Sequence, residues 1–106
     1  MSRTITPQEL KNLAGKTVII DVRRKADLEA DPQKIPDAIW HDPEQVGQWS
    51  AALTPDQEVV IYCVRGGSVS NSVLDHLLGK NIKARYVEGG MVAWKESGGK
   101  IDVTFT

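Results

Sequence analysis

Three apolar runs along the chain predict buried β-strands. They span residues 17–22, 59–62 and 84–87, and the first, Thr17-Val18-Ile19-Ile20-Asp21-Val22, is rich in β-branched residues. Apolar residues at successive positions, without alternation, are typical of a strand that is covered on both faces. A shorter strand near Ile39-Trp40 is predicted after the turn that Ile35-Pro36-Asp37 indicates.

Two segments in the first half of the chain carry helix-start signals. Thr6-Pro7-Gln8-Glu9 has the pattern of a capping box with proline in the first turn, so we expect a short helix that Gly15 ends. Asp42-Pro43 repeats the cap-plus-proline signal and predicts a helix to about Leu53. The charged residues 23–34 fit either a loop or a broken helix.

The second half of the chain predicts two more helices. From Ser68 to Leu78 the apolar side chains recur at helical spacing, which predicts a helix that Gly79 ends. A last helix is expected from Met91, after a tight turn at Gly89-Gly90. The tail, residues 100–106, alternates apolar and polar positions, which fits either an edge strand or a contact with another chain.

The alternation of strands and helices predicts an α/β fold. We expect a small sandwich in which a central, mostly parallel sheet is flanked by helices on both faces. At 106 residues and 11.7 kDa the chain has room for one core, so residues 1–106 are expected to form a single domain. In sheets of this kind, ligands bind at the carboxyl ends of the strands.

Composition and charge exclude several classes of function. Hydrophobic residues make up 41% of the chain and charged residues 25%, as in a globular protein, and the formal net charge of -1 gives no basic surplus for binding nucleic acid. No apolar stretch is long enough to cross a bilayer, and no apolar signal region follows Met1. We therefore expect no nucleic acid or membrane as partner, and a cytoplasmic location.

The one cysteine, Cys63, is the centre of the candidate chemistry. A single cysteine excludes an intramolecular disulfide and a multi-cysteine metal site, and with two histidines it makes a poor zinc set, so we expect neither metal nor cofactor. Cys63 follows the strand at 59–62 and precedes Val64-Arg65-Gly66-Gly67-Ser68 and a helix. This order would place backbone N–H groups around the sulfur, at the positive end of the helix. Such surroundings favour the nucleophilic thiolate, and Arg65 adds a positive charge.

The residues alone leave two interpretations of Cys63 open. A lone cysteine after an apolar strand is commonly a small buried hydrophobe. The two glycines favour a functional interpretation, because a purely structural strand end has no need of a loop that can curl its amides inward.

Four separated segments resemble the single-domain rhodaneses, a family of sulfurtransferases. Asp21-Val22-Arg23 matches an Asp-Val-Arg at the end of an early strand, and Ile35-Pro36-Asp37-Ala38 stands where the family usually has Ile-Pro-Gly-Ala. The loop Cys63 to Ser68 matches the active loop, and Glu88-Gly89-Gly90-Met91-Val92-Ala93-Trp94 matches the C-terminal signature. Together the four segments cover about residues 4–97.

The resemblance implies a rhodanese-like domain that moves sulfane sulfur from a donor such as thiosulfate to a nucleophilic acceptor, cyanide or a thiol, through a persulfide on Cys63. It implies that Cys63 is the nucleophile and that Asp21 and Arg23 are supporting residues beside the loop. The substrate-binding residues it implies are Val64, Arg65, Gly66, Gly67 and Ser68. The expected partners are a small sulfur-containing anion and a thiol acceptor or a protein that accepts sulfur. The physiological donor and acceptor and the oligomeric state stay open.

The chain also departs from the family pattern. Ser68-Val69 stands where many members carry Arg-Ser, so we expect one cationic or hydroxyl donor to be missing, with Arg65 as its substitute. Asp37 replaces the usual glycine of Ile-Pro-Gly-Ala. Phosphatases of related fold need an arginine six positions after the cysteine, where this chain has Val69, which disfavours a phosphatase. The alternative that remains is a noncatalytic module, or a persulfide carrier or sensor that delivers sulfur to a protein partner.

The other conspicuous side chains are expected to be structural. We predict that His41 and His76 lie at the surface and that Trp94 packs in the core and pins the last helix.

Overall fold

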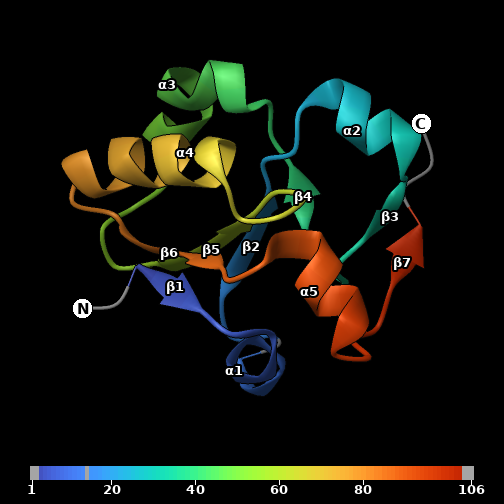
Figure 1. Ribbon diagram of the computed structural model, residues 1–106. Helices are drawn as coiled ribbons and strands as arrows, with labels where there is room; N and C mark the ends of the chain where they lie inside the picture. Colours follow the sequence, from blue (N-terminus) through green and yellow to red (C-terminus); the bar gives the residue numbers. More distant parts are fainter. Residues whose placement is uncertain (1–2, 14, 104–106) are drawn as a thin grey trace.

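The computed structural model describes residues 3–13 and 15–103 and contains a central sheet of five parallel strands (Figure 1). Their order is β1-β6-β5-β2-β4, with β5 in the middle, so the predicted parallel α/β architecture is confirmed. The strands are β1 (Thr4–Ile5), β2 (Val18–Asp21), β4 (Ile39–Trp40), β5 (Glu58–Tyr62) and β6 (Lys83–Val87).

Helices cover both faces of this sheet. Helices α3 (Val46–Trp49) and α4 (Ser68–Gly79) lie on one face, and α1 (Pro7–Asn12) and α5 (Gly90–Glu96) lie on the other (Figure 1). Successive residues of a strand point to opposite faces, which divides the core into two apolar clusters. In β5, Val60 packs with the α1–α5 side, whereas Ile61 packs with the α4 side.

The start of α1 is the predicted capping box. The Thr6 hydroxyl accepts a hydrogen bond from the Glu9 backbone N–H at 3.1 Å, and the Glu9 carboxylate accepts one from the Thr6 N–H at 3.0 Å. The two bonds satisfy backbone donors that the first turn of a helix leaves without intrahelical partners.

Residues 42–53 do not form the continuous helix that the sequence predicts. They form the 3-10 helix η1 (Pro43–Gln45), the single α-helical turn of α3 and the 3-10 helix η2 (Ser50–Ala52). Gly47 has low helix propensity, and the Trp49 indole donates to the Asp42 carbonyl at 2.8 Å. The glycine and the bond between Trp49 and Asp42 therefore explain why the segment is not one continuous α-helix.

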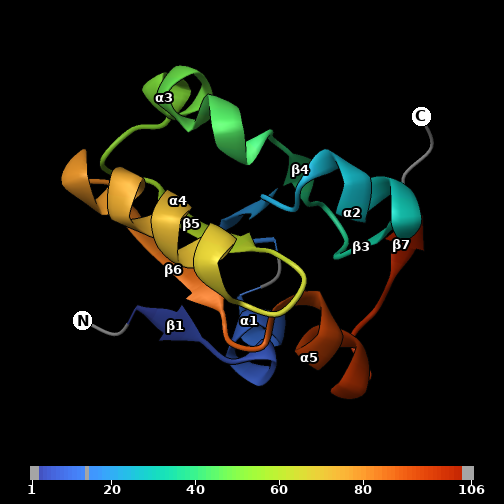
Figure 2. The ribbon, with the colours of Figure 1, turned by 45° about the horizontal axis from the view of Figure 1, so that its top comes forward.

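The charged segment 23–34, for which the sequence left two interpretations open, contains α2 (Lys25–Ala30) and β3 (Gln33–Lys34). Strand β3 pairs antiparallel with β7 (Asp102–Val103), so the described part of the tail is a strand in a small second sheet (Figure 2). Residues 104–106 of the predicted tail lie outside the described residues.

Helix α4 ends differently from the prediction. Gly79 is its last helical residue, and the chain turns at Asn81, whose φ of +63° is in the left-handed region. Asn81 N–H donates to the Leu78 carbonyl at 3.0 Å and Ile82 N–H donates to the Leu77 carbonyl at 3.1 Å. This pair of bonds is a Schellman motif, in which asparagine substitutes for the more common glycine.

Among the described helices, none has the length and apolar character that crossing a bilayer requires.

Candidate functional site

Cys63 lies directly after β5, at the carboxyl edge of the sheet. Its residue is 6% exposed and its thiol is free. The side chain belongs to the apolar cluster on the α4 side, together with Val22 and Val73. The sulfur is thus largely withdrawn from water but sits at the strand edge where α/β sheets bind their ligands.

A buried hydroxyl contacts this sulfur. Ser70 is fully buried on the first turn of α4, and its Oγ donates a hydrogen bond to Cys63 Sγ across 2.9 Å. The sequence predicts that one cationic or hydroxyl donor is missing, because Ser68-Val69 stands where many family members carry Arg-Ser. A hydroxyl is present one residue later, on Ser70, and no sequence signal indicated it.

The loop after Cys63 contains backbone hydrogen-bond donors without partners. The N–H groups of residues 64–67 donate to no acceptor within residues 3–13 and 15–103. Gly66 has a φ of +71°, and a Cβ on it would lie 3.1 Å from the Val87 carbonyl oxygen and 3.2 Å from the Gly89 nitrogen. A side chain at this position would therefore crowd the turn between β6 and α5, which explains the glycine.

The amino terminus of α5 holds the other side of the loop. Met91 N–H donates to the Cys63 carbonyl at 2.9 Å, and Val92 N–H donates to the Val64 carbonyl at 3.1 Å. Gly90 has a φ of +61°, and a Cβ on it would lie 2.6 Å from the Val64 carbonyl oxygen. The turn before α5 is therefore built from glycine so that the two backbones can approach closely, as the sequence predicted.

These two bonds also orient the next peptide groups. In a planar trans peptide the C=O and the following N–H point in opposite directions, and the described chain has no cis peptide bond. Since the carbonyls of Cys63 and Val64 point at α5, the N–H groups of Val64 and Arg65 point away from it. Cys63 belongs to the cluster on the opposite, α4 side of the sheet.

Asp21 and Arg23, at the end of the neighbouring strand β2, form a fully buried ion pair. Arg23 Nη2 lies 2.8 Å from Asp21 Oδ2, and Arg23 Nε donates to both carboxylate oxygens at 3.0 and 3.1 Å. Burial alone would lower the pKa of Arg23, but the Asp21 carboxylate outweighs it, so the pKa is raised and the guanidinium stays charged.

The same guanidinium ties down the segment after α2. Its Nη1 and Nη2 donate to the carbonyls of Asp31 and Gln33, each at 2.9 Å, while the Arg23 carbonyl accepts from the Trp40 indole at 2.8 Å. Tyr62, beneath Arg23, accepts from the Ile35 N–H, and burial raises its pKa so that it stays neutral. Asp21 and Arg23 thus brace the backbone beside Cys63.

The remaining predicted residues differ in their surroundings. Arg65 is exposed and forms no hydrogen bond or ion pair with any residue that the structure describes. His76 is exposed as predicted. His41 is half-buried instead, stacked on Trp49 with ring centroids 4.9 Å apart, and burial lowers its pKa. In the described ranges no His, Cys, Asp and Glu side chains gather into a group of three or more that could hold a metal.

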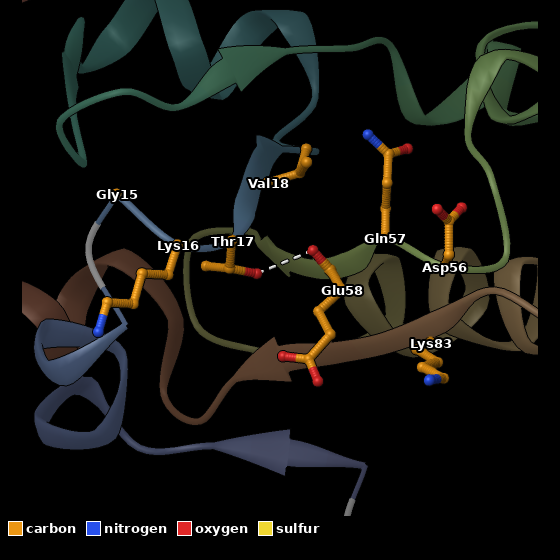
Figure 3. Close-up of a pocket in the computed structure, with 8 residues that line it drawn as sticks. All are labelled: Gly15, Lys16, Thr17, Val18, Asp56, Gln57, Glu58 and Lys83. Carbon is orange, nitrogen blue, oxygen red and sulfur yellow. Dashed lines mark hydrogen bonds between the residues drawn. The ribbon is translucent and has the colours of Figure 1, made fainter.

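Pockets formed by the described residues border the loop, whereas the pocket in Figure 3 lies elsewhere. One of about 190 Å³ is lined by Arg23, Val64 and Lys95 among others, and another of about 270 Å³ by Arg24 and Ser68 among others. The pocket in Figure 3, of about 540 Å³, lies at the amino ends of β2, β5 and β6 and contains none of the predicted site residues.

The family is decided by the comparison of the whole sequence with known families. The Rhodanese-like domain matches residues 6–97, which is most of the chain. The chain belongs to the rhodanese-like family. No curated protein matches it.

Solved structures of other proteins share the fold over nearly the whole chain. A rhodanese-like domain protein from Staphylococcus aureus is 28% identical with a TM-score of 0.81, covering 98% of this chain and 100% of its own. A rhodanese-related protein from Thermoplasma volcanium is 22% identical with a TM-score of 0.83, covering 95% and 98%. A Rhodopseudomonas palustris protein of unknown function, described as a possible tyrosine phosphatase, is 25% identical with a TM-score of 0.77, covering 94% and 84%.

Proposed function

We propose that this rhodanese-like domain is a sulfurtransferase that carries sulfane sulfur as a persulfide on Cys63. The observation that supports it most is the combination at one strand end of a free thiol, a hydroxyl bonded to its sulfur and a loop whose backbone N–H groups have no partner in the described ranges. A cysteine that served only to fill the core would need none of these donors.

The reaction follows from the chemistry of the thiolate. The Cys63 thiolate attacks the outer sulfur of thiosulfate, the bond between the two thiosulfate sulfurs breaks, and sulfite leaves with the electron pair. The acceptor, cyanide or a thiolate, then attacks the outer sulfur of the Cys63 persulfide. The bond to Sγ breaks and the Cys63 thiolate is regenerated, so that neither step changes the total number of electrons.

The loop from Val64 to Ser68 is the proposed cradle for the transferred sulfur. Its N–H groups that have no partner among the described residues, two of which point away from α5, supply donors to an anion on the α4 side. The amino terminus of α4 adds a partial positive charge. Donors fixed in place before the reaction stabilise charge without reorganisation. Arg65, exposed beside them, is the proposed guide for the anionic donor.

The proposed partners are a small sulfur-containing anion, and a thiol or a sulfur-accepting protein. A reducing compartment such as the cytoplasm suits this chemistry because it keeps a lone thiol free. A carrier or sensor that hands its sulfur only to a protein uses the same Cys63 persulfide, so the acceptor separates it from the enzyme.

The phosphatase that one structural relative's description suggests is not proposed for this chain. Val69, six positions after Cys63, has an apolar side chain, where a phosphatase loop places an arginine on the substrate's oxyanion. We expect an aryl phosphate to remain uncleaved.

The test is sulfur transfer from thiosulfate to cyanide, followed as thiocyanate. We expect turnover by the wild-type chain and none by Cys63→Ser, with circular dichroism showing that both are folded. Turnover with small thiols in place of cyanide identifies an enzyme, whereas transfer only to a protein acceptor identifies a carrier. A folded wild-type chain that transfers sulfur from no donor would overturn the proposal.

A further inference from the structure

We infer that Ser70 is a catalytic residue of the proposed sulfur transfer: its hydroxyl stabilises the Cys63 thiolate when the thiolate attacks and when it leaves. The inference rests on the proposed function for its role in turnover. It rests on the geometry alone for its effect on the thiolate.

The contact is buried and specific. Ser70 Oγ lies 2.9 Å from Cys63 Sγ, Ser70 is fully buried, and Cys63 is 6% exposed. Water therefore has little access to compete for the sulfur. In such surroundings a hydroxyl that donates to an anion is worth more than the same contact in solvent.

The Ser70 hydroxyl forms no competing hydrogen bond with the described backbone. Serine in a helix commonly donates to the carbonyl four residues earlier, which for Ser70 is that of Gly66. Among the described residues the Ser70 hydroxyl has Cys63 Sγ as its partner and forms no such backbone bond. The first turn of α4 therefore presents its buried hydroxyl to the sulfur.

A donor at Sγ has a different effect in each half of the reaction. Before the first step the negative charge is on Sγ, and a donor there raises the fraction of thiolate at a given pH. In the persulfide the charge moves to the outer sulfur. When the acceptor attacks, charge returns to Sγ as the bond breaks, and the donor makes Cys63 a better leaving group.

The two halves therefore respond differently to removal of the hydroxyl. At a pH where Cys63 is fully ionised in both the wild type and Ser70→Ala, the thiolate of Ser70→Ala is the more basic of the two. It is therefore a slightly better nucleophile than the wild-type thiolate. The same change makes the thiolate a poorer leaving group. Loss of the hydroxyl is thus expected to slow sulfur delivery while leaving sulfur uptake unchanged or slightly faster.

The first measurement is the ultraviolet absorbance of the thiolate against pH, with Cys63→Ser as the baseline. Because the chain has one cysteine, the difference reports on Cys63 alone. We expect Ser70→Ala to move the midpoint of this titration upward by about one pH unit, a tenfold change in the ionisation equilibrium. Ser72→Ala, an exposed neighbour on α4, is the matched control and is expected to leave the midpoint unchanged.

The second measurement separates uptake from delivery in single turnovers. Uptake is followed by mixing the reduced protein with thiosulfate, and delivery by mixing the persulfide form with cyanide. At high pH we expect Ser70→Ala to slow delivery about three- to tenfold and not to slow uptake. Ser70→Thr keeps the hydroxyl and is expected to restore the titration midpoint and the delivery rate toward wild type.

The outcomes distinguish this inference from the proposed function. If the wild-type chain forms no persulfide but Ser70→Ala raises the titration midpoint, the proposed function fails and the contact with the thiolate stands. If Ser70→Ala and Ser72→Ala share the wild-type midpoint and delivery rate, the role of Ser70 is wrong whether or not sulfur is transferred. Should Ser70→Ala fail to fold, a midpoint in folded Ser70→Thr more than one unit above wild type would also contradict the inference.

Discussion

Two buried polar centres lie side by side at the carboxyl edge of the sheet. One, the arginine anchor, is the ion pair of Asp21 and Arg23 after β2, and the other is Cys63 with Ser70 after β5, the strand paired with β2. Arg23 uses its side-chain nitrogens on one carboxylate and two carbonyls. Among the described residues, the Cys63 sulfur accepts a hydrogen bond from the Ser70 hydroxyl, and the backbone N–H groups of residues 64–67 beside it have no partner.

The difference shows how one edge of a sheet can hold structure and chemistry together. A buried charge that is paired and hydrogen-bonded mostly within the protein is a rigid brace with little capacity left for a ligand. A sulfur with one donor and unpaired N–H groups nearby keeps that capacity. On this account, damage to the arginine anchor lowers stability most, whereas damage to the cysteine loop, residues 63–68, lowers sulfur transfer most.

The largest expected effect on stability comes from Arg23→Met. It leaves the Asp21 carboxylate buried without its counter-charge and frees the carbonyls of Asp31 and Gln33. We expect the free energy of unfolding to fall by about 3–5 kcal/mol, measured by urea denaturation. Arg24→Met, one residue on and exposed, is the control and is expected to change it by less than about 0.5 kcal/mol. Equal losses in both variants would contradict the account of the anchor.

Gly90→Ala is expected to damage the cysteine loop more selectively. An alanine at this position would have a strained backbone, because φ is positive there. Its Cβ would overlap the Val64 carbonyl, which α5 holds in place. We expect a loss of about 2–3 kcal/mol in stability and a larger proportional loss of persulfide formation with thiosulfate. Gly98→Ala is the matched control, because Gly98 has a φ of +77° but no atom within 4 Å of the added Cβ. We expect Gly98→Ala to form the persulfide as the wild type does. If both variants lose it alike, backbone strain rather than loop position is responsible.

Asp37→Gly is expected to stabilise the protein. Asp37 has a φ of +68°, in the left-handed region that favours glycine, and it is exposed. Relief of this strain outweighs the extra flexibility of glycine, and we expect a gain of about 0.5–1 kcal/mol, seen as a higher melting temperature. Asp56→Gly, at an exposed turn without positive φ, offers no such relief and is expected to destabilise slightly. A loss of stability in Asp37→Gly would contradict the argument.

The smallest effect is expected for the ion pair between Lys95 and Asp31, which joins α5 to the segment that Arg23 braces. The Lys95 ammonium, hydrogen-bonded to Asp31, lowers the pKa of that carboxyl. The pair therefore stabilises the fold above the ordinary pKa of aspartate and ceases to do so as the pH falls through the folded-state value. We expect Lys95→Ala to lose a few tenths of a kcal/mol at neutral pH, since the pair is partly exposed. The difference from wild type should vanish in acid, while exposed Lys16→Ala, the control, shows no such pH dependence.

Much of the fold follows from local sequence signals. The capping box at Thr6, the apolar runs of β2, β5 and β6 and the spacing along α4 each predict the element that the structure contains. The short strand β1 carries no periodicity in its two residues and depends on pairing with β6, so the sequence did not predict it. Leu28 is the one buried side chain of α2, too few apolar positions for a helical pattern.

The candidate site depends on the sequence less completely than the fold does. The sequence makes Cys63 and its glycine loop the candidate because strand, loop and helix follow one another along the chain. Ser70, seven residues after Cys63, has no distinguishing sequence signal, because its hydroxyl reaches the sulfur only once the loop turns the chain back into α4. The resemblance implies only that Asp21 and Arg23 are supporting residues, because the carbonyls of Asp31 and Gln33 that Arg23 binds are a tertiary feature.

The mass of the intact protein after mixing with thiosulfate is the most direct measure of whether Cys63 carries sulfur. The account predicts that the wild-type chain gains the mass of one sulfur atom, loses it again on addition of cyanide, and that Cys63→Ser gains nothing. A folded, reduced wild-type chain whose mass stays the same with thiosulfate and with every other sulfane donor would contradict it.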